Sequence, residues 1–332
     1  MTRRSRWHGR PAVLAWTAVL ILAVAGDAVA NPNVWRSEWP RTDFSRHSVP
    51  FDEIMSGGPS KDGIPAIDSP SFAPASAPGG LAPNEPVISL TIAGDARAYP
   101  LRIMIWHEIV NDTIGGVPVA VTWCPLCNSS VVFDRRLDGR TLSFGTTGKL
   151  RHSDLVMYDR ETETWWQQFS GVAIVGALVD RELKPLPSRV ESVARFRARH
   201  PDGNILVPPG GAARPYGRNP YVGYDKSNWP FLFQGEYKDR VPPLSRVVVV
   251  GGEAWSLQLL MRKRRIEAGD LLITWEPGQA SALDAADIVS GDDIGNVVVQ
   301  RRGAQGWQDE VHDVSFAFAF RAFHPHGRLH HE

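Results

Sequence analysis

The chain has 332 residues, with 36 basic and 36 acidic side chains, two cysteines and twelve tryptophans. This length corresponds to two domains or one large one, and 43% hydrophobic residues suffice for a core. The balanced charge argues against a nucleic-acid-binding protein, which would carry a basic surplus. Two cysteines exclude a disulfide-dense scaffold and a four-thiolate metal site within one chain.

Residues 1–30 have the features of a signal peptide. Four arginines among residues 3–10 precede a mostly apolar stretch, and Ala28-Val29-Ala30 fits a cleavage site. The sequence therefore predicts a periplasmic or secreted protein, exported by the general secretory route or, because Arg3 and Arg4 are adjacent, by the twin-arginine route. The alternative is an uncleaved N-terminal membrane anchor. After cleavage, 32 basic and 35 acidic groups remain, and no integral membrane segment is expected.

The rest of the chain divides into three parts. Residues 31–83 are rich in Pro, Ser and Gly and predict an extended arm or linker, from which aromatic side chains such as Trp39 and Phe44 can dock on the body. Residues 84–207 form a first lobe, and residues 208–332 form a second, shorter lobe. The predicted fold is α+β and β-rich, with two pseudo-repeated lobes of short, mainly antiparallel strands and a few helices.

Local patterns place the expected elements. Gly94-Asp95 and Leu137–Arg140 read as hairpin turns between short strands. Helical spacing predicts helices over 101–112 and 191–201, the second ended by Pro201. Strand-like runs are expected at 87–94, 96–101, 117–123, 129–135, 245–260 (as a hairpin) and 296–302.

Three sequence segments recur in the same order in both lobes. Residues 88–104 resemble 246–261, TWCPLC at 122–127 faces TWEPGQ at 274–279, and FRARHPDG at 196–203 faces FRAFHPHG at 320–327. Three matches in one order predict a tandem duplication. A residue that the fold needs is expected in both lobes, as Trp123 and Trp275 are.

The comparison of the lobes also predicts where a site lies. Cys124 and Cys127 correspond to Glu276 and Gln279, so the fold does not require the thiols. The second lobe also lacks about 40 residues, which correspond to the first-lobe segment around 144–171. Both observations place a candidate site in the first lobe.

The Cys124–Cys127 turn predicts a metal site. Pro125 favours a tight turn that brings the two sulfur atoms together, as in the cysteine knuckles of zinc and iron sites. The further ligand must be His, Asp or Glu. His107 and Glu108 on the preceding helix are the best candidates, with His107 preferred, and His152 and Asp154 are weaker ones. A site with two cysteines and one histidine suits zinc or copper.

The sequence also allows other interpretations than a metal site. Glu108 and Asp159 are candidate catalytic groups for proton transfer near the ion. The cysteine pair also fits a structural disulfide in a non-catalytic periplasmic binding module, or the site of a thiol–disulfide oxidoreductase. Trp165 and Trp166 suggest a small-molecule ligand, with core packing as the alternative.

The run WHEIVNDTIGGVPVAVTWCPLCNSSVVFDR, followed by MYDRETETWWQ, resembles the bacterial domain-of-unknown-function family 3179 over roughly residues 52–325. CPLC followed by SVVFDR is the most specific part. The family usually has Gly where Asn128 stands, and a segment like SGLLYNSDLLMYDR where this chain has TGKLRHSDLVMYDR. The resemblance therefore implies no ligand role for His152, and it implies no activity.

Overall fold

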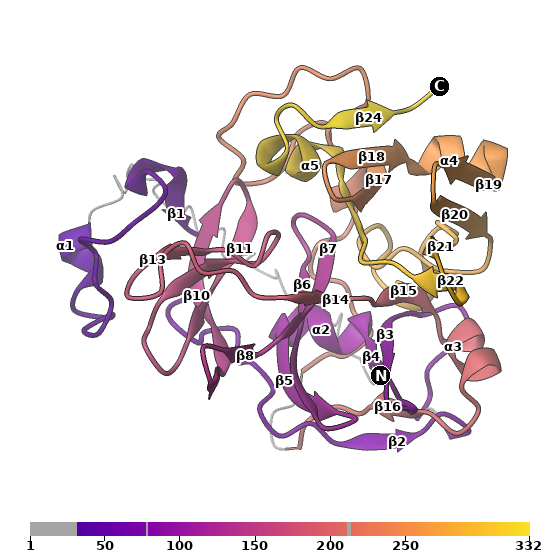
Figure 1. Ribbon diagram of the computed structural model, residues 1–332, viewed down its shortest axis with the longest axis horizontal. Coiled ribbons are helices and arrows are strands. Elements are labelled where there is room, and N and C mark those ends of the chain that lie inside the picture. Colours follow the sequence, from indigo (N-terminus) through magenta and orange to yellow (C-terminus); the bar gives the residue numbers. More distant parts are fainter. Residues whose placement is uncertain (1–31, 78, 211–213) are drawn as a thin grey trace, which may run out of the picture.

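Strands dominate the computed structural model of the chain, which describes residues 32–77, 79–210 and 214–332. They form small, mostly antiparallel sheets arranged in a ring, with a few short helices (Figure 1). This confirms the predicted β-rich α+β class. The predicted signal peptide lies outside the described residues. Within those three stretches, no helix is long and apolar enough to span a membrane.

Two sheets build the first lobe. The first has the order β15-β3-β4-β16-β2 and the second the order β14-β7-β6-β5. Their strands are β2 (Phe72–Pro74), β3 (Pro86–Ile92), β4 (Asp95–Pro100), β5 (Ile109–Ile114), β6 (Val117–Cys124), β7 (Ser129–Asp134), β14 (Pro185–Leu186), β15 (Arg189–Ser192) and β16 (Asn204–Leu206). The predicted hairpins at Gly94-Asp95 and Leu137–Arg140 are both present, the second as β8 (Arg136–Leu137) and β9 (Arg140–Thr141).

The helix expected over 101–112 is shorter than predicted. Helix α2 spans Leu101–His107 and stops at Glu108, whose φ of 58° lies outside the helical region. The next residues, including Ile109 and Val110, form β5 and pair with β6 along its length. β-Branched side chains favour this extended pairing, which overrides the local helical spacing. Helix α3 (Val193–Arg199) lies within its predicted range.

The second lobe has the same order of elements. Its sheets are β23-β17-β18-β24 and β19-β20-β21-β22. Their strands are β17 (Arg246–Val250), β18 (Glu253–Ser256), β19 (Arg265–Ala268), β20 (Leu271–Glu276), β21 (Asn296–Gly303), β22 (Gly306–Asp309), β23 (Asp313–Phe316) and β24 (Arg328–His330), with helices α4 (Leu257–Lys263) and α5 (Ala317–Phe323).

Strand orientations match as well as strand order. The strand after the second helix pairs in parallel with the second hairpin strand in each lobe, β16 with β4 and β24 with β18. Glu108 and Arg264 end α2 and α4 with φ angles of 58° and 62°. The residues after α3 and α5, His200 and His324, each donate a backbone N–H to the carbonyl four residues earlier. This match is what a tandem duplication would produce, and the boundary at residue 208 stays a prediction.

A further sheet occupies the segment that the second lobe lacks. Its order is β1-β10-β11-β12-β13, and it lies to the left in Figure 1. The strands are β1 (Ile54–Ser56), β10 (Phe144–Arg151), β11 (Asp154–Asp159), β12 (Trp165–Gln167) and β13 (Ala173–Val175). This inserted sheet therefore lies beside the β6–β7 hairpin, which carries the cysteines at its end.

The N-terminal arm packs on the inserted sheet. It contains α1 (Pro32–Trp35) and the short 3-10 turn Phe51–Glu53. It also supplies strand β1, which pairs with β10 of the inserted sheet. Trp39 is fully buried, and its ring lies 5.2 Å from that of Trp165 in a T-shaped contact. Phe44 contacts the same indole. The expected docking of aromatic side chains from this arm is thus present.

One hydrophobic cluster joins the two lobes. It combines side chains of the first lobe, such as Val121 and Phe133, with Leu283, Phe316 and Phe318 of the second. The lobes therefore share a continuous core at the position of the cysteine hairpin. A smaller cluster around Trp255 and Trp275 lies within the second lobe.

Candidate metal centre

The cysteine loop is the end of the β6–β7 hairpin. Cys124 pairs with Ser129, and the four residues between them form the turn. The backbone N–H of Asn128 donates to the carbonyl of Pro125 at 3.2 Å, and Asn128 has a φ of 52°. Glycine and asparagine are the residues that adopt this left-handed conformation most readily. The geometry is thus one that suits both the Asn of this chain and the Gly that the family resemblance leads us to expect here.

A second tight turn faces the loop. Arg151 pairs with Asp154, and the two residues between them, His152 and Ser153, have φ angles of 53° and 64°. Two successive positive φ angles define a two-residue hairpin turn in which Asn is favoured first. The Asn that the family resemblance leads us to expect at position 152 would suit this backbone conformation, which agrees with the absence of an implied ligand role for His152.

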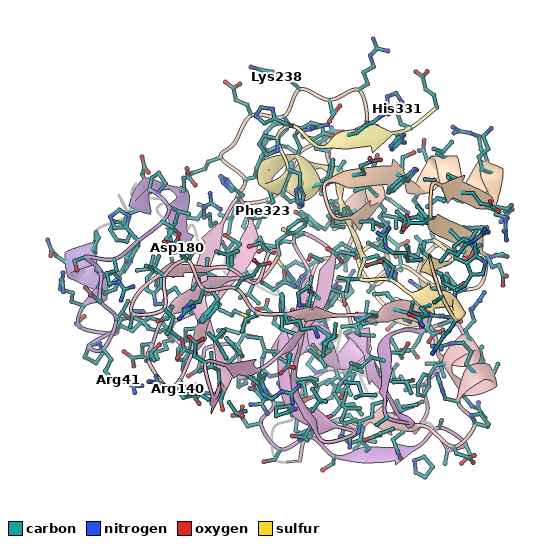
Figure 2. The ribbon with its side chains drawn as sticks, in the orientation of Figure 1. Arg41, Arg140, Asp180, Lys238, Phe323 and His331 are labelled. Atoms are coloured by element: carbon teal, nitrogen blue, oxygen red, sulfur yellow. The ribbon has the colours of Figure 1, made fainter. Side chains whose placement is uncertain are left out.

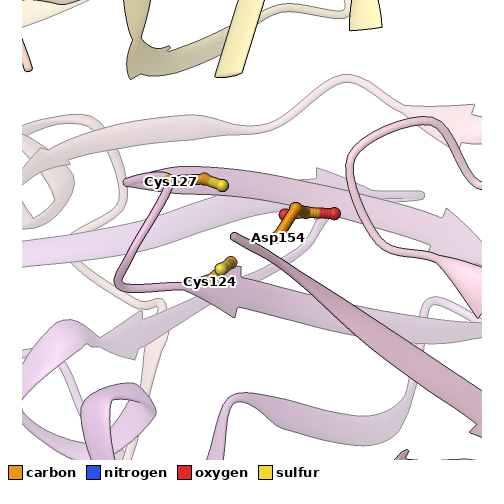
Figure 3. Close-up of side chains that lie close together, drawn as sticks. All are labelled: Cys124, Cys127 and Asp154. Atoms are coloured by element: carbon orange, nitrogen blue, oxygen red, sulfur yellow. The ribbon is translucent and has the colours of Figure 1, made fainter. Parts of the chain in front are cut away.

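Cys124, Cys127 and Asp154 come together between these two turns. The two Sγ atoms and a carboxylate oxygen all lie within 4.8 Å of one another, and Figure 3 shows both sulfur atoms near Asp154. The carbonyl oxygen of Ser153 accepts from both thiols, at 3.7 Å from Cys124 and 3.4 Å from Cys127. Neighbouring ligand atoms of a tetrahedral zinc site lie ~3.4–3.8 Å apart, given its bond lengths. The limit of 4.8 Å in this structure is up to about 1 Å wider than these spacings, so the three groups would have to draw together to hold an ion.

Asp154 is held by one carboxylate oxygen. Its Oδ2 accepts from Nε2 of Gln167 at 2.6 Å and from the N–H of Phe169 at 3.0 Å. Its Oδ1 has no N–H or O–H partner among the described residues, although the side chain is fully buried, and the two thiols lie close enough to hydrogen-bond this carboxylate. Burial raises the pKa of Asp154 to about 6, against the lowering effect of its hydrogen bonds. A buried oxygen with only weak thiol donors beside it is costly, and an ion would compensate it.

Both cysteines are buried free thiols. Burial raises the pKa of Cys124 above its ordinary value. The pKa of Cys127 is raised well above its ordinary value, first by burial and then by the closeness of Cys124 and Asp154. Thiols with raised pKa values are poor nucleophiles, since the thiolate is the reactive form. The metal-free pair is therefore unlike the low-pKa cysteines of thiol oxidoreductases.

Glu108 lies next to this group. It is buried at the end of α2, and burial together with the negative charge of Asp154 raises its pKa to about 8. Glu108 is also close enough to Tyr221 to raise the pKa of that phenol. A carboxyl group with this pKa is mostly protonated at neutral pH.

Residues 214–233 cover the cysteine loop and are called the covering segment. The hydroxyl of Tyr224 donates to the carbonyl of Leu126 at 2.9 Å, and the hydroxyl of Ser153 donates to the carbonyl of Phe231 at 2.6 Å. Apart from the 3-10 turn Tyr224–Lys226, this segment contains no helix or strand. It contacts both the cysteine loop and the β10–β11 turn of the inserted sheet.

Strand β23 of the second lobe also holds the loop. The N–H of Phe316 donates to the carbonyl of Cys127 at 2.8 Å, and the N–H of Ser130 donates to Oδ1 of Asp313 at 2.7 Å. Burial raises the pKa of Asp313 to about 7. Both lobes thus fix the geometry of the cysteine loop.

The structure does not bring the two candidate histidines to the thiols. The ring of His107 contacts the carbonyl of Pro65 through Nδ1 at 2.7 Å and the hydroxyl of Tyr216 through Nε2 at 2.9 Å. His152 lies 3.4 Å from a carboxylate oxygen of Glu53. Asp154, a weaker candidate from the sequence, is the residue that meets the cysteines.

Asp159 has partners of its own at the other end of β11. It accepts from the N–H and the hydroxyl of Thr162 and from the indole N–H of Trp166 at 2.9 Å. These contacts hold the turn between β11 and β12. Trp165 and Trp166 are fully buried, and core packing accounts for both.

Sequence reasoning missed the carbonyl of Ser153, Asp313 and the covering segment. The consecutive residues His152, Ser153 and Asp154 carried a usable signal, since they lie between two strand-like runs and form a two-residue turn. No short-range pattern marks Asp313 or the covering segment, because both are distant in sequence from the cysteine loop that they contact.

Fold and site define a β-rich protein with a buried cysteine–aspartate group at the junction of two lobes and an inserted sheet. The family model described as "Protein of unknown function (DUF3179)" matches residues 61–327. The chain therefore belongs to this family. No curated protein and no solved structure matches it.

Proposed function

We propose that the chain is a metal-binding protein, with zinc held by Cys124, Cys127 and Asp154. The observation that carries this proposal is the carboxylate of Asp154, which is fully buried within 4.8 Å of both sulfur atoms and has no N–H or O–H partner at Oδ1 among the described residues. Two thiolates and a carboxylate are ordinary zinc ligands, and three protein ligands leave one position for a further group. The carbonyl of Ser153 faces the same point.

Zinc is favoured over copper by the donor set. Copper(I) selects soft sulfur ligands, whereas a carboxylate oxygen beside two thiolates suits the borderline zinc ion. Gln167 and the N–H of Phe169 would orient Asp154 from the outside, as outer hydrogen bonds commonly do for metal ligands. The sequence-based ligand set is thereby revised, with Asp154 in place of His107.

The main competing state is a Cys124–Cys127 disulfide. It is favoured by the closeness of the two thiols and by the oxidising compartment to which the predicted signal peptide would export the chain. A thiol oxidoreductase is the weakest candidate, because both thiols are buried and their pKa values are raised. In the proposal, the ion is bound either in the cytoplasm before export or in the compartment to which the chain is exported.

The test is elemental analysis of the chain expressed with its own leader and purified without a histidine tag. We expect about one zinc per chain, and two thiols that react only after denaturation with a chelator. Cys124→Ser and Asp154→Asn should each lower the zinc content at least tenfold. His152→Asn, which keeps the turn conformation and resembles the family segment, should retain zinc and serves as the matched control.

Two results would overturn the proposal. One is a metal-free chain with an oxidised Cys124–Cys127 pair, which supports the structural disulfide. The other is equal loss of zinc in His152→Asn and Asp154→Asn, which would mean that binding is not specific to this site. If the chain contained copper instead of zinc at the same stoichiometry, the proposed ligands would stand and the identity of the ion would change.

A further inference from the structure

A cleft of about 450 Å³ lies between the lobes, and no residue of the covering segment lines it. Strand β7, the region of β12 and β13, and β23 with the end of α5 supply its walls. This volume falls in the range of small-molecule sites, which occur preferentially at interfaces between domains. The cleft is separate from the metal ligands, because none of Cys124, Cys127 and Asp154 lines it.

The walls of the cleft are apolar and aromatic. Phe169 and Phe323 stack with ring centroids 4.6 Å apart and planes 20° apart, and Figure 2 shows Phe323 at the end of α5. Phe133 and the valines Val131 and Val311 also line it. Flat, rigid rings of this kind favour a planar apolar ligand that can pack on their faces.

The cleft has a polar end on β23. Asp313 lines it and is buried, and its Oδ1 accepts from the N–H of Ser130. The hydroxyl of Ser129 lies close to the same carboxyl group, but neither it nor Oδ2 has a well-formed hydrogen bond within the described residues. The neighbouring His312 uses Nδ1 for the carbonyl of Glu310 at 2.9 Å. A buried carboxyl oxygen without a well-formed hydrogen bond at the end of an apolar cleft is where a ligand's polar group would gain most.

The guanidinium that lines the cleft is already paired. The guanidinium of Arg151 is paired with the carboxylate of Glu53 at 2.6 Å, and Glu182 is exposed to solvent. An anionic ligand would therefore find no free cationic partner among the lining residues. An uncharged ligand would lose less hydration on binding.

We propose that this cleft binds a small, uncharged organic molecule with a planar apolar body and one hydroxyl or carbonyl group, which meets Asp313. This site does not depend on the proposed metal. Gln167 and Phe169 line the cleft and also hydrogen-bond Asp154, so the ligand lies one residue away from the cysteine–aspartate group.

The test is binding of 2-naphthol to the full chain, measured by equilibrium dialysis with and without chelator. We expect saturable binding at one site in both conditions. Val311→Trp and Val131→Trp each fill the cleft and should weaken binding at least tenfold. Met261→Trp is the matched control, because Met261 lines a different cavity, of about 530 Å³, in the second lobe.

A second comparison tests the polar end. The wild-type chain should bind 2-naphthol several-fold tighter than naphthalene, and Asp313→Ala should abolish this preference while retaining naphthalene binding. Non-saturable binding, or equal loss in Met261→Trp and both filled variants, would overturn the proposal. Zinc content measured on the same samples separates failure of the cleft from failure of the metal site.

Discussion

The side-chain amide of Asn128 donates a hydrogen bond to the carbonyl of Val314 at 2.7 Å, and so attaches the cysteine loop to the second lobe. The two residues are 186 positions apart in the chain. Asn128 thus has two roles, since it also adopts the left-handed conformation that the loop needs. The two roles can be separated by substitution.

Asn128→Gly keeps the backbone conformation and removes only the side-chain hydrogen bond. We expect it to lower the free energy of unfolding by about 1 kcal/mol. Asn128→Ala removes the bond and also adds the cost of a Cβ in the left-handed region, roughly another 1–2 kcal/mol. Urea unfolding of both variants checks this order. A larger loss for Gly than for Ala would mean that the positive φ does not limit the choice of residue.

Stability of the metal-free chain should depend on pH through Asp313. Burial raises its pKa to about 7 in the folded chain, against an ordinary value of 3.8. Between these values the folded chain binds a proton that the unfolded chain has lost, so the free energy of unfolding falls as pH rises from about 4 to 7. The raised pKa of Asp154, about 6, acts in the same direction.

The measurement is urea unfolding at several pH values in the presence of chelator. Asp313 alone should contribute a fall on the order of 4 kcal/mol across this window, with further falls from Asp154 and from Glu108, whose pKa is raised to about 8, and Asp313→Asn should make the dependence shallower. An increase in stability with pH, or an unchanged slope in Asp313→Asn, would contradict the assignment of a buried, protonated Asp313.

Glu108→Gln should retain zinc. With a pKa of about 8, Glu108 is already uncharged at pH 7, and glutamine is close to it in shape. We therefore expect the zinc stoichiometry and the unfolding midpoint at pH 7 to stay near the wild-type values. Elemental analysis decides the matter, since loss of zinc would show that Glu108 is itself a ligand.

Trp39→Ala should show that the N-terminal arm is part of the folded body. Trp39 is fully buried against Trp165 and Tyr158, so its removal should cost about 3–5 kcal/mol in the free energy of unfolding. Val34→Ala is the control, because Val34 is 67% exposed, and its effect should be within measurement error. Equal effects would place the arm outside the cooperative unit.

The sequence predicted those parts of the fold and site that depend on residues close together in the chain. Alternating apolar residues located β6 and β7, Gly94-Asp95 located a hairpin, and the two-lobe comparison directed attention to Cys124 and Cys127. It also located the inserted segment, which contains Asp154. Each of these rests on local periodicity or on internal similarity, both of which can be read from a single chain.

The third member of the site depended on contacts that are distant in sequence. His107 seemed the better ligand because it ends a helix before the cysteine hairpin, but its ring contacts come from residues 42 and 109 positions away. Asp154 reaches the thiols only because β10 and β11 form a two-residue turn that meets the cysteine loop. No pattern in the chain encodes how two hairpins face each other.

The covering segment has a kinetic consequence. Tyr224 and Phe231 connect it to Leu126 and Ser153 beside the buried thiols, so an ion held by the proposed ligands would leave when these contacts open. The residence time of the ion would then follow the rate of chain opening rather than the strength of its ligands. A folded chain would retain whichever ion it had enclosed, and the choice of metal would be made by the compartment in which the chain folds.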